Sequence, residues 1–283
     1  MLRFLQVLIF IALINVCTVC VNAEEIQTKG FSKSLPPLTG GVQENSYYGT
    51  STSRDTTGYL KDSLTGEPIE GATVSVPDKG ISTKSRADGG FKLDLPATQG
   101  NFILSVKKQG YLPFALNAKK DDFYNPFTLH LDQLQGQIVI DNNIHHLGDN
   151  NYSSRSANAA SFQLPSEGPV FMKEFYVEDL PPKGMVLKIG TIVGLDTMAS
   201  RELGQSTISA FSSPLSIFVN SIKIAEIAVN ENNKEIPIYN GVLKPHSKNL
   251  LVFQTGVNQI TAMSGTLDYD DFEFMNVFLE LAK

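Results

Sequence analysis

Two polar stretches in the C-terminal half of the chain carry the side chains with the greatest capacity for chemistry. In the first, the pair His145-His146 precedes the oxygen-rich run Asp149–Asn151. The second is the acidic run Asp268–Glu273, which holds four carboxylates within six residues. Crowded carboxylates repel one another unless a cation lies among them. The pattern therefore indicates a bound cation or, as the plainer interpretation, fully solvated surface charge.

Calcium is the cation that these ligand types favour, because Ca²⁺ takes about six to eight oxygen ligands from carboxylates, amides and backbone carbonyls. Asp149 follows the first strand expected in this half of the chain, and Asp270 and Asp271 open the last one. The first and last strands of antiparallel sandwiches often lie side by side. We therefore predict one structural Ca²⁺ held by Asp149 with Asp270, Asp271 or both, and a plain polar turn at Asp149 is the alternative.

The two histidines are not expected to share a metal, because adjacent residues of a strand point to opposite faces. The simpler expectation is one buried, hydrogen-bonded histidine and one exposed histidine. His146, Asn151 and Tyr152 are nevertheless candidate contacts for a polar ligand at this end of the domain.

Several kinds of chemistry lack their sequence signals. The only cysteines are Cys17 and Cys20, so the rest of the chain offers no thiol nucleophile and no cysteine zinc cluster. HExxH, G-x-S-x-G and phosphate-binding glycine motifs are absent from the sequence. A formal net charge of −6 disfavours electrostatic binding of nucleic acid. A glycosidase pair of carboxylates stays open as an alternative.

The elements that must position these residues are β-strands. Residues 58–111 contain three successive hairpin patterns, each closed by its own turn residues. Gly66 and the Asp88-Gly89-Gly90 turn are expected to supply positive φ angles. Phe91, Leu93 and Leu95 alternate with charged residues, which gives a strand with one apolar face.

This first β-rich region, residues 58–133, resembles the carboxypeptidase regulatory-like domain. The resemblance implies a transthyretin-like β-sandwich of the kind found in secreted bacterial proteins. It implies no active site and favours a structural or adhesive spacer. The residues that carry it are Asp62, Thr65, Gly66, Pro68, Ile69, Gly71, Ala72, Val74, Val76, Thr83, Asp88, Gly89, Phe91, Leu93, Leu95, Pro96, Gly100, Phe102, Val106, Gly110 and Tyr111.

Residues 134–283 contain many short strand patterns separated by turn signals, which indicates a sandwich or jelly roll. A hairpin at Asn220, a Lys244-Pro245 turn and the closing Asp270–Leu281 segment resemble the galactose-binding-like jelly roll. His246 stands where that family's turn has glycine. The predicted strands are Gln137–Asp141, Ser161–Leu164, Val170–Val177, Val186–Val193, Leu215–Val219, Ile222–Val229, Glu235–Tyr239, Asn249–Thr255 and Phe272–Leu281, with a short helical turn near Thr197–Gly204.

The sequence of the N-terminal residues indicates that the protein is exported. Residues 1–23 combine Arg3, an apolar run and a terminal Val-Asn-Ala, as in a secretory signal peptide. A membrane anchor and a lipoprotein acylated at Cys17 or Cys20 are the alternatives. Residues 24–57 are poor in aliphatic side chains, and we expect a flexible linker there. The expected location is secreted or periplasmic, with no membrane contact after signal removal.

The resemblance to galactose-binding-like domains implies a non-catalytic protein that binds a glycan or another cell-surface component through the jelly roll, with calcium as a structural ion. The chain lacks tryptophan, the best platform for a sugar ring, so tyrosine would have to replace it. The alternatives are a structural cell-envelope component without a small ligand and a glycoside hydrolase-like enzyme. The sequence leaves the oligomeric state open. The candidate platforms are Tyr152, Tyr176, Tyr239 and Tyr269.

Overall fold

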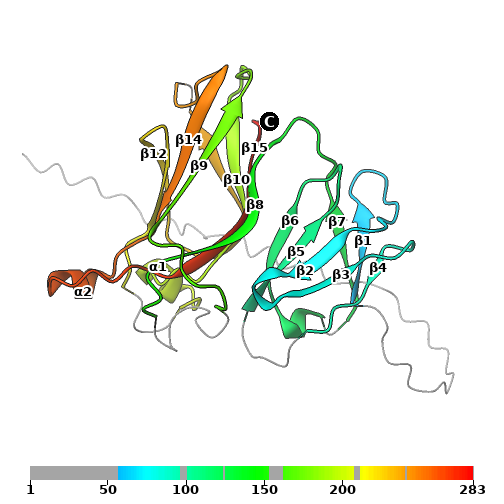
Figure 1. Cartoon of the computed structure of the whole chain (residues 1–283), viewed down its shortest axis with the longest axis horizontal. Helices are drawn as coiled ribbons and strands as arrows, with labels where there is room; N and C mark the ends of the chain where they lie inside the picture. Colours follow the sequence, from blue (N-terminus) through cyan, green and yellow to red (C-terminus); the bar gives the residue numbers. More distant parts are fainter. Residues whose placement is uncertain are drawn as a thin grey trace, which may run out of the picture. The chain divides into compact units, whose positions relative to one another are not determined.

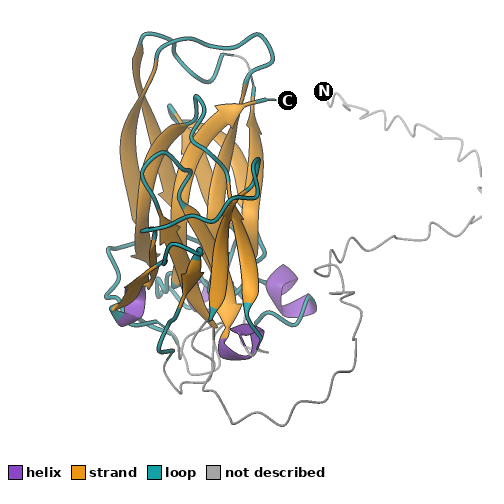
Figure 2. Cartoon of the chain, turned by 90° about the vertical axis from the view of Figure 1, so that its right-hand side faces the viewer, coloured by secondary structure: helices purple, strands orange, loops and turns teal. Residues whose placement is uncertain are grey.

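The computed structural model describes residues 57–95, 101–123, 125–152, 162–206, 211–239 and 241–282. By its internal contacts the chain divides into Met1–Ser51 and Thr52–Lys283, and all described residues belong to the second unit. The predicted signal peptide and all of the predicted linker except Thr57 lie outside the described residues. The fold class is all-β, as the sequence predicts. Short helical segments only join or follow the strands of the described part (Figures 1 and 2).

The first body is a sandwich of two sheets, with strand orders β4-β1-β7 and β3-β2-β5-β6. β1 pairs with β7 in parallel and with β4 antiparallel. Leu60, Phe91 and Leu104 are among the fully buried side chains of the shared core. Its elements are β1 (Gly58–Asp62), β2 (Thr73–Val76), η1 (Pro77–Lys79), β3 (Ile81–Lys84), β4 (Gly90–Phe91), β5 (Asn101–Lys107), β6 (Phe114–Lys119), η2 (Lys120–Phe123) and β7 (Phe127–Leu131).

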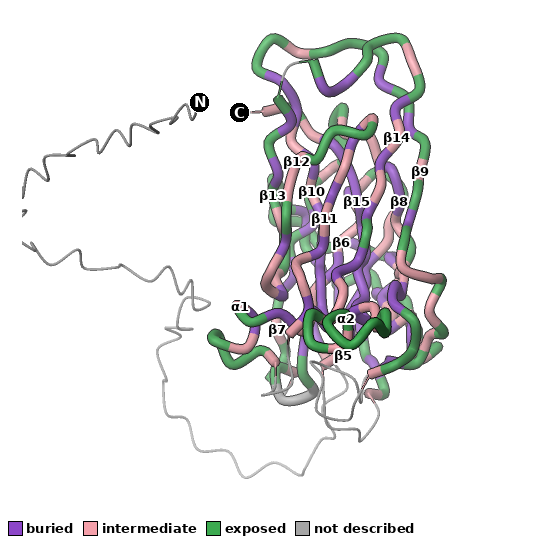
Figure 3. Tube along the Cα trace, turned by 90° about the vertical axis from the view of Figure 1, so that its left-hand side faces the viewer, coloured by how far each residue is buried: buried purple, intermediate pink, exposed green. Residues whose placement is uncertain are grey.

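The second body is an eight-stranded jelly roll. Its two sheets have the strand orders β13-β10-β15-β8 and β12-β11-β14-β9. In chain order the strands cross between the sheets at nearly every step, and the first strand, β8, pairs with the last, β15. β15 is buried over most of its length (Figure 3). Its elements are β8 (Ile138–Leu147), β9 (Val170–Val177), β10 (Met185–Val193), α1 (Met198–Glu202), β11 (Leu215–Val219), β12 (Ile222–Ile227), β13 (Glu231–Ile238), β14 (Ser247–Gln254), α2 (Gln259–Met263) and β15 (Phe272–Leu281).

The predicted turn chemistry is present at the key positions. Gly66 and Gly89 have φ angles of 74° and 77°. Asn220 has a φ of 51°, as expected for the β11–β12 hairpin. His246 has a φ of 50°, so this residue adopts the left-handed conformation that glycine would adopt at no cost.

Several segments differ from the sequence prediction, among them β13, which begins at Glu231 and not at the predicted Glu235. β8 continues past Asp141 to Leu147, so the histidine pair lies within a strand and not after one. Residues 162–164 do not form the predicted strand. Phe162 instead packs against His146, with ring centroids 4.7 Å apart, and so anchors a loop. The sequence shows no helical periodicity at α2, so this helix was not predicted.

Gly89 should tolerate a side chain far less well than Gly66. A Cβ at Gly89 would lie 2.4 Å from the Leu60 carbonyl oxygen, whereas a Cβ at Gly66 would meet nothing within 4 Å. Both positions share the cost of positive φ, about 1 kcal/mol. In urea unfolding, Gly89→Ala should therefore lose at least about 1 kcal/mol more than the matched Gly66→Ala. Equal losses would contradict the close approach of this turn to β1.

Candidate functional site

The two sandwiches contact each other through β6 and the sheet that contains β10 and β15. A small apolar cluster of Ile103, Ala115, Val193 and Met275 forms the centre of this contact. A polar contact flanks it, because the Asn117 amide donates to Asn232 Oδ1 at 2.9 Å. The interface therefore places the edge strand β6 of the first sandwich against the β13-β10-β15-β8 sheet of the jelly roll.

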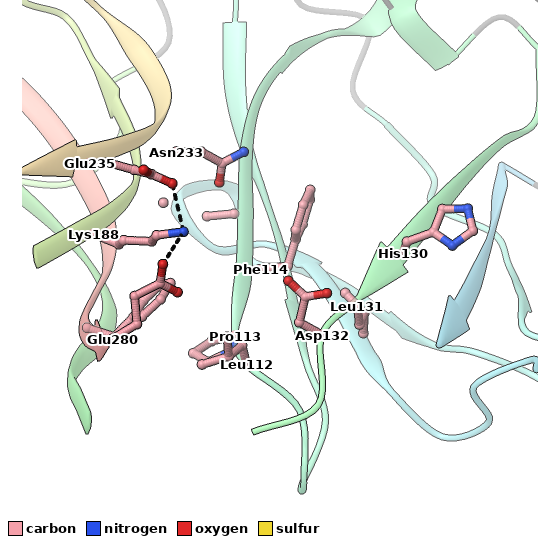
Figure 4. A pocket seen from close by; sticks show the side chains of 13 residues that line it. Leu112, Pro113, Phe114, His130, Leu131, Asp132, Lys188, Asn233, Glu235 and Glu280 are labelled. Carbon is pink, nitrogen blue, oxygen red and sulfur yellow. Dashed lines mark ion pairs between the residues drawn. The ribbon is translucent and has the colours of Figure 1, made fainter. Parts of the chain in front are cut away.

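A groove lies along this interface, with walls from both sandwiches. One part has a volume of about 350 Å³, and a second part of about 310 Å³ shares Leu112, Asp132, Lys188 and Glu280 with it. Pro113, Phe114 and Asp132 lie on one wall, opposite Lys188 on the other (Figure 4). The second part continues the groove past the side chains of Gln133, Gln135 and Gln137.

Lys188 is fixed at the centre of the jelly-roll wall by two carboxylates. Its Nζ lies 2.8 Å from Glu235 Oε1 and 2.7 Å from Glu280 Oε1 (Figure 4). Burial alone would lower the pKa of Lys188, but hydrogen bonds and charge from Glu235 and Glu280 raise it above the usual lysine value. Lys188 therefore stays positively charged. Because it has two carboxylate partners, the net charge of the three side chains on this wall is negative.

The chemistry of the groove fits a small polar ligand. Ligand pockets of a few hundred Å³ usually combine apolar walls with a few polar groups that fix orientation. Phe114 and Phe278 provide apolar surface, and Asp132 and Asn233 provide hydrogen-bonding groups. The carboxylates would repel an anionic ligand.

At one end of the jelly roll, His146 and Asp271 form a buried pair across the first and last strands. The side chains have 0% and 1% exposure, and His146 Nε2 lies 3.0 Å from Asp271 Oδ1. His146 Nδ1 lies 2.8 Å from the Leu164 carbonyl oxygen. The sequence expectation of one buried, hydrogen-bonded histidine is confirmed for His146, whereas His145, the histidine expected to be exposed, has a side chain that is only 14% exposed.

The partners of His146 fix its charge. A carbonyl oxygen can only accept, so Nδ1 must donate to Leu164. Asp271 Oδ1 also accepts from the Asn150 amide at 2.9 Å, so Nε2 donates to an acceptor as well. Burial would lower the pKa of His146, but the hydrogen bond to Asp271 and the charge of Asp271 raise it above the usual value. The pair is therefore an imidazolium and a carboxylate.

His145 points to the opposite face, as strand alternation predicts. Its ring packs 4.6 Å from that of Phe171, and its nitrogens lie 2.9 Å from Glu167 Oε2 and 3.2 Å from Asp141 Oδ1. The two adjacent histidines therefore share no partner in the described residues.

The predicted loop residues are held in a hydrogen-bond network. Asp149 accepts from the Asn151 and Tyr269 amides, at 2.9 Å and 3.0 Å. Asn151 Nδ2 donates to Asp268 at 2.9 Å. Tyr152 packs edge-on against Phe162, with centroids 5.2 Å apart. This network ties three loops of the jelly roll together.

The structure brings Asp149 and Asp271 together, as predicted from the pairing of the first and last strands. The Asp149 amide lies 3.4 Å from Asp271 Oδ2. Asp270 belongs to a separate network, in which its carboxylate accepts from the Asp196 amide at 3.1 Å. Burial raises the pKa of Asp270 well above its usual value. Of the two acids that the prediction left open, Asp271 lies beside Asp149 and Asp270 does not, because consecutive residues point to opposite sides.

Within the described ranges, no group of three or more histidine, cysteine, aspartate or glutamate side chains is arranged to hold a metal ion. The oxygens of Asp149 and Asp271 have N–H donors as partners. The calcium site stays a prediction.

Sequence reasoning missed the groove, because its walls come from strands distant in sequence. Lys188 lies in β10, whereas Glu235 and Glu280 lie in β13 and β15. The position of Asp270 could have been predicted from the sequence. Period-two alternation along a strand places Asp270 on the opposite face from Asp271 and Glu273.

Removing the charge of Asp271 should strongly destabilise the protein, because it leaves a buried imidazolium without its partner. We expect Asp271→Asn to lower the free energy of unfolding by about 3–5 kcal/mol, measured by urea unfolding at pH 6. The matched control is Glu174→Gln, which removes an exposed partner of Lys248 and should change stability little. Similar losses in the two variants would contradict the buried pair.

Comparisons with known proteins identify no family for this chain. No family model matches it, and no curated protein matches it. One similar solved structure is a protein from Bacteroides fragilis NCTC 9343 that is described as membrane-associated and of unknown function. The two share 11% identity with a TM-score of 0.20, over 78% of this chain and 95% of that one. Likeness this weak carries no argument. No helix among the described residues is long and apolar enough to cross a membrane.

Proposed function

We propose that this chain is an exported, non-catalytic binding protein that holds a neutral glycan or similar polar cell-surface ligand in the groove between its two sandwiches. The observation that carries the proposal is the groove itself, a depression of about 350 Å³ with apolar and hydrogen-bonding side chains on facing walls. The proposal of export rests on the signal-like residues 1–23.

The facing walls support a sugar-like ligand. A sugar ring has an apolar face and a rim of hydroxyl groups, so it needs an apolar surface beside hydrogen-bonding groups. Phe114 and Pro113 offer that surface, and Asp132 and Asn233 offer the polar partners. The glutamines of the second part are uncharged donors and acceptors that would suit a longer neutral chain.

The proposal changes the role expected for the first sandwich. The resemblance to a carboxypeptidase regulatory-like domain implies a spacer, and the sequence analysis names His146, Asn151 and Tyr152 as candidate ligand contacts. His146 is fully buried and Asn151 donates to Asp268. Because the groove has walls from both bodies, we assign ligand binding to both.

One observation favours the structural cell-envelope alternative. β9 is an edge strand, and its exposed side includes Val170, Met172 and Tyr176, with exposures of 39%, 63% and 48%. Such an edge could pair with a partner chain. The hydrolase alternative would need a carboxyl group of raised pKa beside the ligand. Glu273 has a raised pKa, but it is buried and does not line the groove.

Binding should be sensitive to the groove and insensitive to the edge strand. On a glycan array, the parent protein should bind at least one neutral glycan. Phe114→Ala and Asp132→Asn should each weaken that binding by about tenfold or more, which is the size of one lost contact of about 1.4 kcal/mol. Tyr176→Ala is the matched control on the exposed face of β9 and should bind as the parent does. Loss of binding in Tyr176→Ala alone would place the site on β9 instead.

Calcium binding at the loop network is a separate proposal with a direct test. If Asp149 and Asp271 share a Ca²⁺, calcium added to EDTA-treated protein should raise the melting temperature of the parent. At a hundredfold excess over Kd the gain is about 2.7 kcal/mol. Asp149→Ala and Asp271→Ala should not respond. If the melting temperature of the parent does not change when calcium is added, Asp149 and Asp271 do not share a Ca²⁺ ion.

A further inference from the structure

One end of the jelly roll carries an exposed apolar projection that does not line the groove. This projection, residues 257–267, contains α2 and is called the tip loop below; α2 extends away from the sheets (Figure 1). Met263, Leu267 and Ile260 have exposures of 89%, 64% and 53%. Ile260 and Met263 are three residues apart on α2, so their side chains lie on the same side of the helix. Met263 is the most exposed large apolar residue of the described part of the chain.

α1 lies at the same end of the domain and adds to this apolar surface (Figures 1 and 3). Ser212 forms one β-bridge with Thr197, directly before α1, and another with Asn258, directly before α2. The two helices therefore begin on either side of one short segment. Met198 and Leu203, at the two ends of α1, have exposures of 50% and 65%.

Hydrogen bonds fix both ends of the tip loop. The Asn258 side chain accepts from the Ile260 amide at 3.0 Å and so caps α2. Its amide nitrogen Nδ2 donates to Asp268 Oδ2 at 3.0 Å, and the Asn258 backbone amide donates to the Asp268 carbonyl oxygen at 2.8 Å. The apolar side chains are therefore held outward by a closed, capped turn.

The tip loop also differs from other exposed apolar positions in its lack of charge. No residue from 257 to 267 is charged. On β9, by contrast, the exposed Met172 is followed directly by Lys173 and Glu174. Charged side chains resist transfer from water into an apolar phase, because the loss of hydration is costly. The tip loop lacks this obstacle.

The shape of the projection favours a lipid surface over a protein partner. A specific protein interface buries about 800 Å² on each side, from about 20–30 residues. The tip loop instead offers a few side chains on a convex turn. A bilayer needs no complementary surface, and it takes up the apolar face of an amphipathic segment to a depth of about 5–10 Å.

We propose that the tip loop and α1 contact a lipid bilayer, with Ile260, Met263 and Leu267 inserted at the boundary between headgroups and acyl chains. The formal net charge of −6 disfavours an anionic surface, so the lipid is zwitterionic. This contact departs from the sequence expectation that the chain has no membrane contact after signal removal. The proposal does not rest on the groove, because the residues that line the groove are different ones.

A polarity-sensitive dye on the tip loop tests the contact. In the full chain with Cys17 and Cys20 changed to serine, Ser264→Cys places a single dye beside Met263. Phosphatidylcholine vesicles at about 1 mM lipid should shift its emission to the blue, since a single myristoyl chain already binds with a constant of about 10⁴ M⁻¹. The dye reports only its own surroundings, so binding through residues 1–23 alone would not produce the shift.

Two glutamate variants of the labelled chain provide the matched comparison. Met263→Glu should raise the lipid concentration for the half-maximal shift by about tenfold or more, which corresponds to about 1.4 kcal/mol. Met172→Glu changes a methionine of 63% exposure on β9 and should follow the labelled parent. Because both methionines are exposed, both variants should keep the near-ultraviolet circular dichroism of the parent.

The proposal would be overturned if the emission does not change when vesicles are added, or if the two glutamate variants respond alike. A blue shift that grows with protein concentration in the absence of lipid would also overturn it, because a second copy of this chain would then cover the tip loop. The glycan array reports on the groove alone, so failure of the groove proposal and failure of the lipid contact are distinguishable.

Discussion

The buried ion pair between His146 and Asp271 is the interaction on which the jelly roll depends. It joins β8 to β15, the first and last strands of the domain. Asp271 also accepts the Asn150 amide, and His146 also donates to Leu164, so one pair holds two loops. The close approach requires Gly148, where a Cβ would lie 2.5 Å from the Asp271 carboxyl carbon. Breaking a buried pair costs about 3–5 kcal/mol, a large part of the total stability of about 5–15 kcal/mol.

The acidic run Asp268–Glu273 shows how four neighbouring acids are accommodated in different ways. Asp271 is balanced by a histidine of the chain itself. Asp268 accepts from Asn151 and Asn258, at 2.9 Å and 3.0 Å. Asp270 accepts backbone donors in a buried network, and Glu273 keeps its proton. The repulsion that suggested a bound cation is thus relieved for Asp271 by an internal cation.

Local rules predicted the strands and turns better than the interface. β9, β11 and β15 have the predicted limits because alternating or continuous apolar patterns are local signals. The pairing of first and last strands followed from topology. The groove could not be predicted, because it depends on how the two cores meet. One core is built from residues between 60 and 131, and the other from residues between 140 and 279.

The protonation state of His146 tests the central ion pair most directly. Nitrogen-15 NMR of the imidazole ring reports separately whether each ring nitrogen carries a proton. The account predicts that both nitrogens of His146 are protonated in the folded chain at pH 6.5, with a titration midpoint above that value. A neutral ring with one unprotonated nitrogen at pH 6.5, or a midpoint below it, would contradict the account.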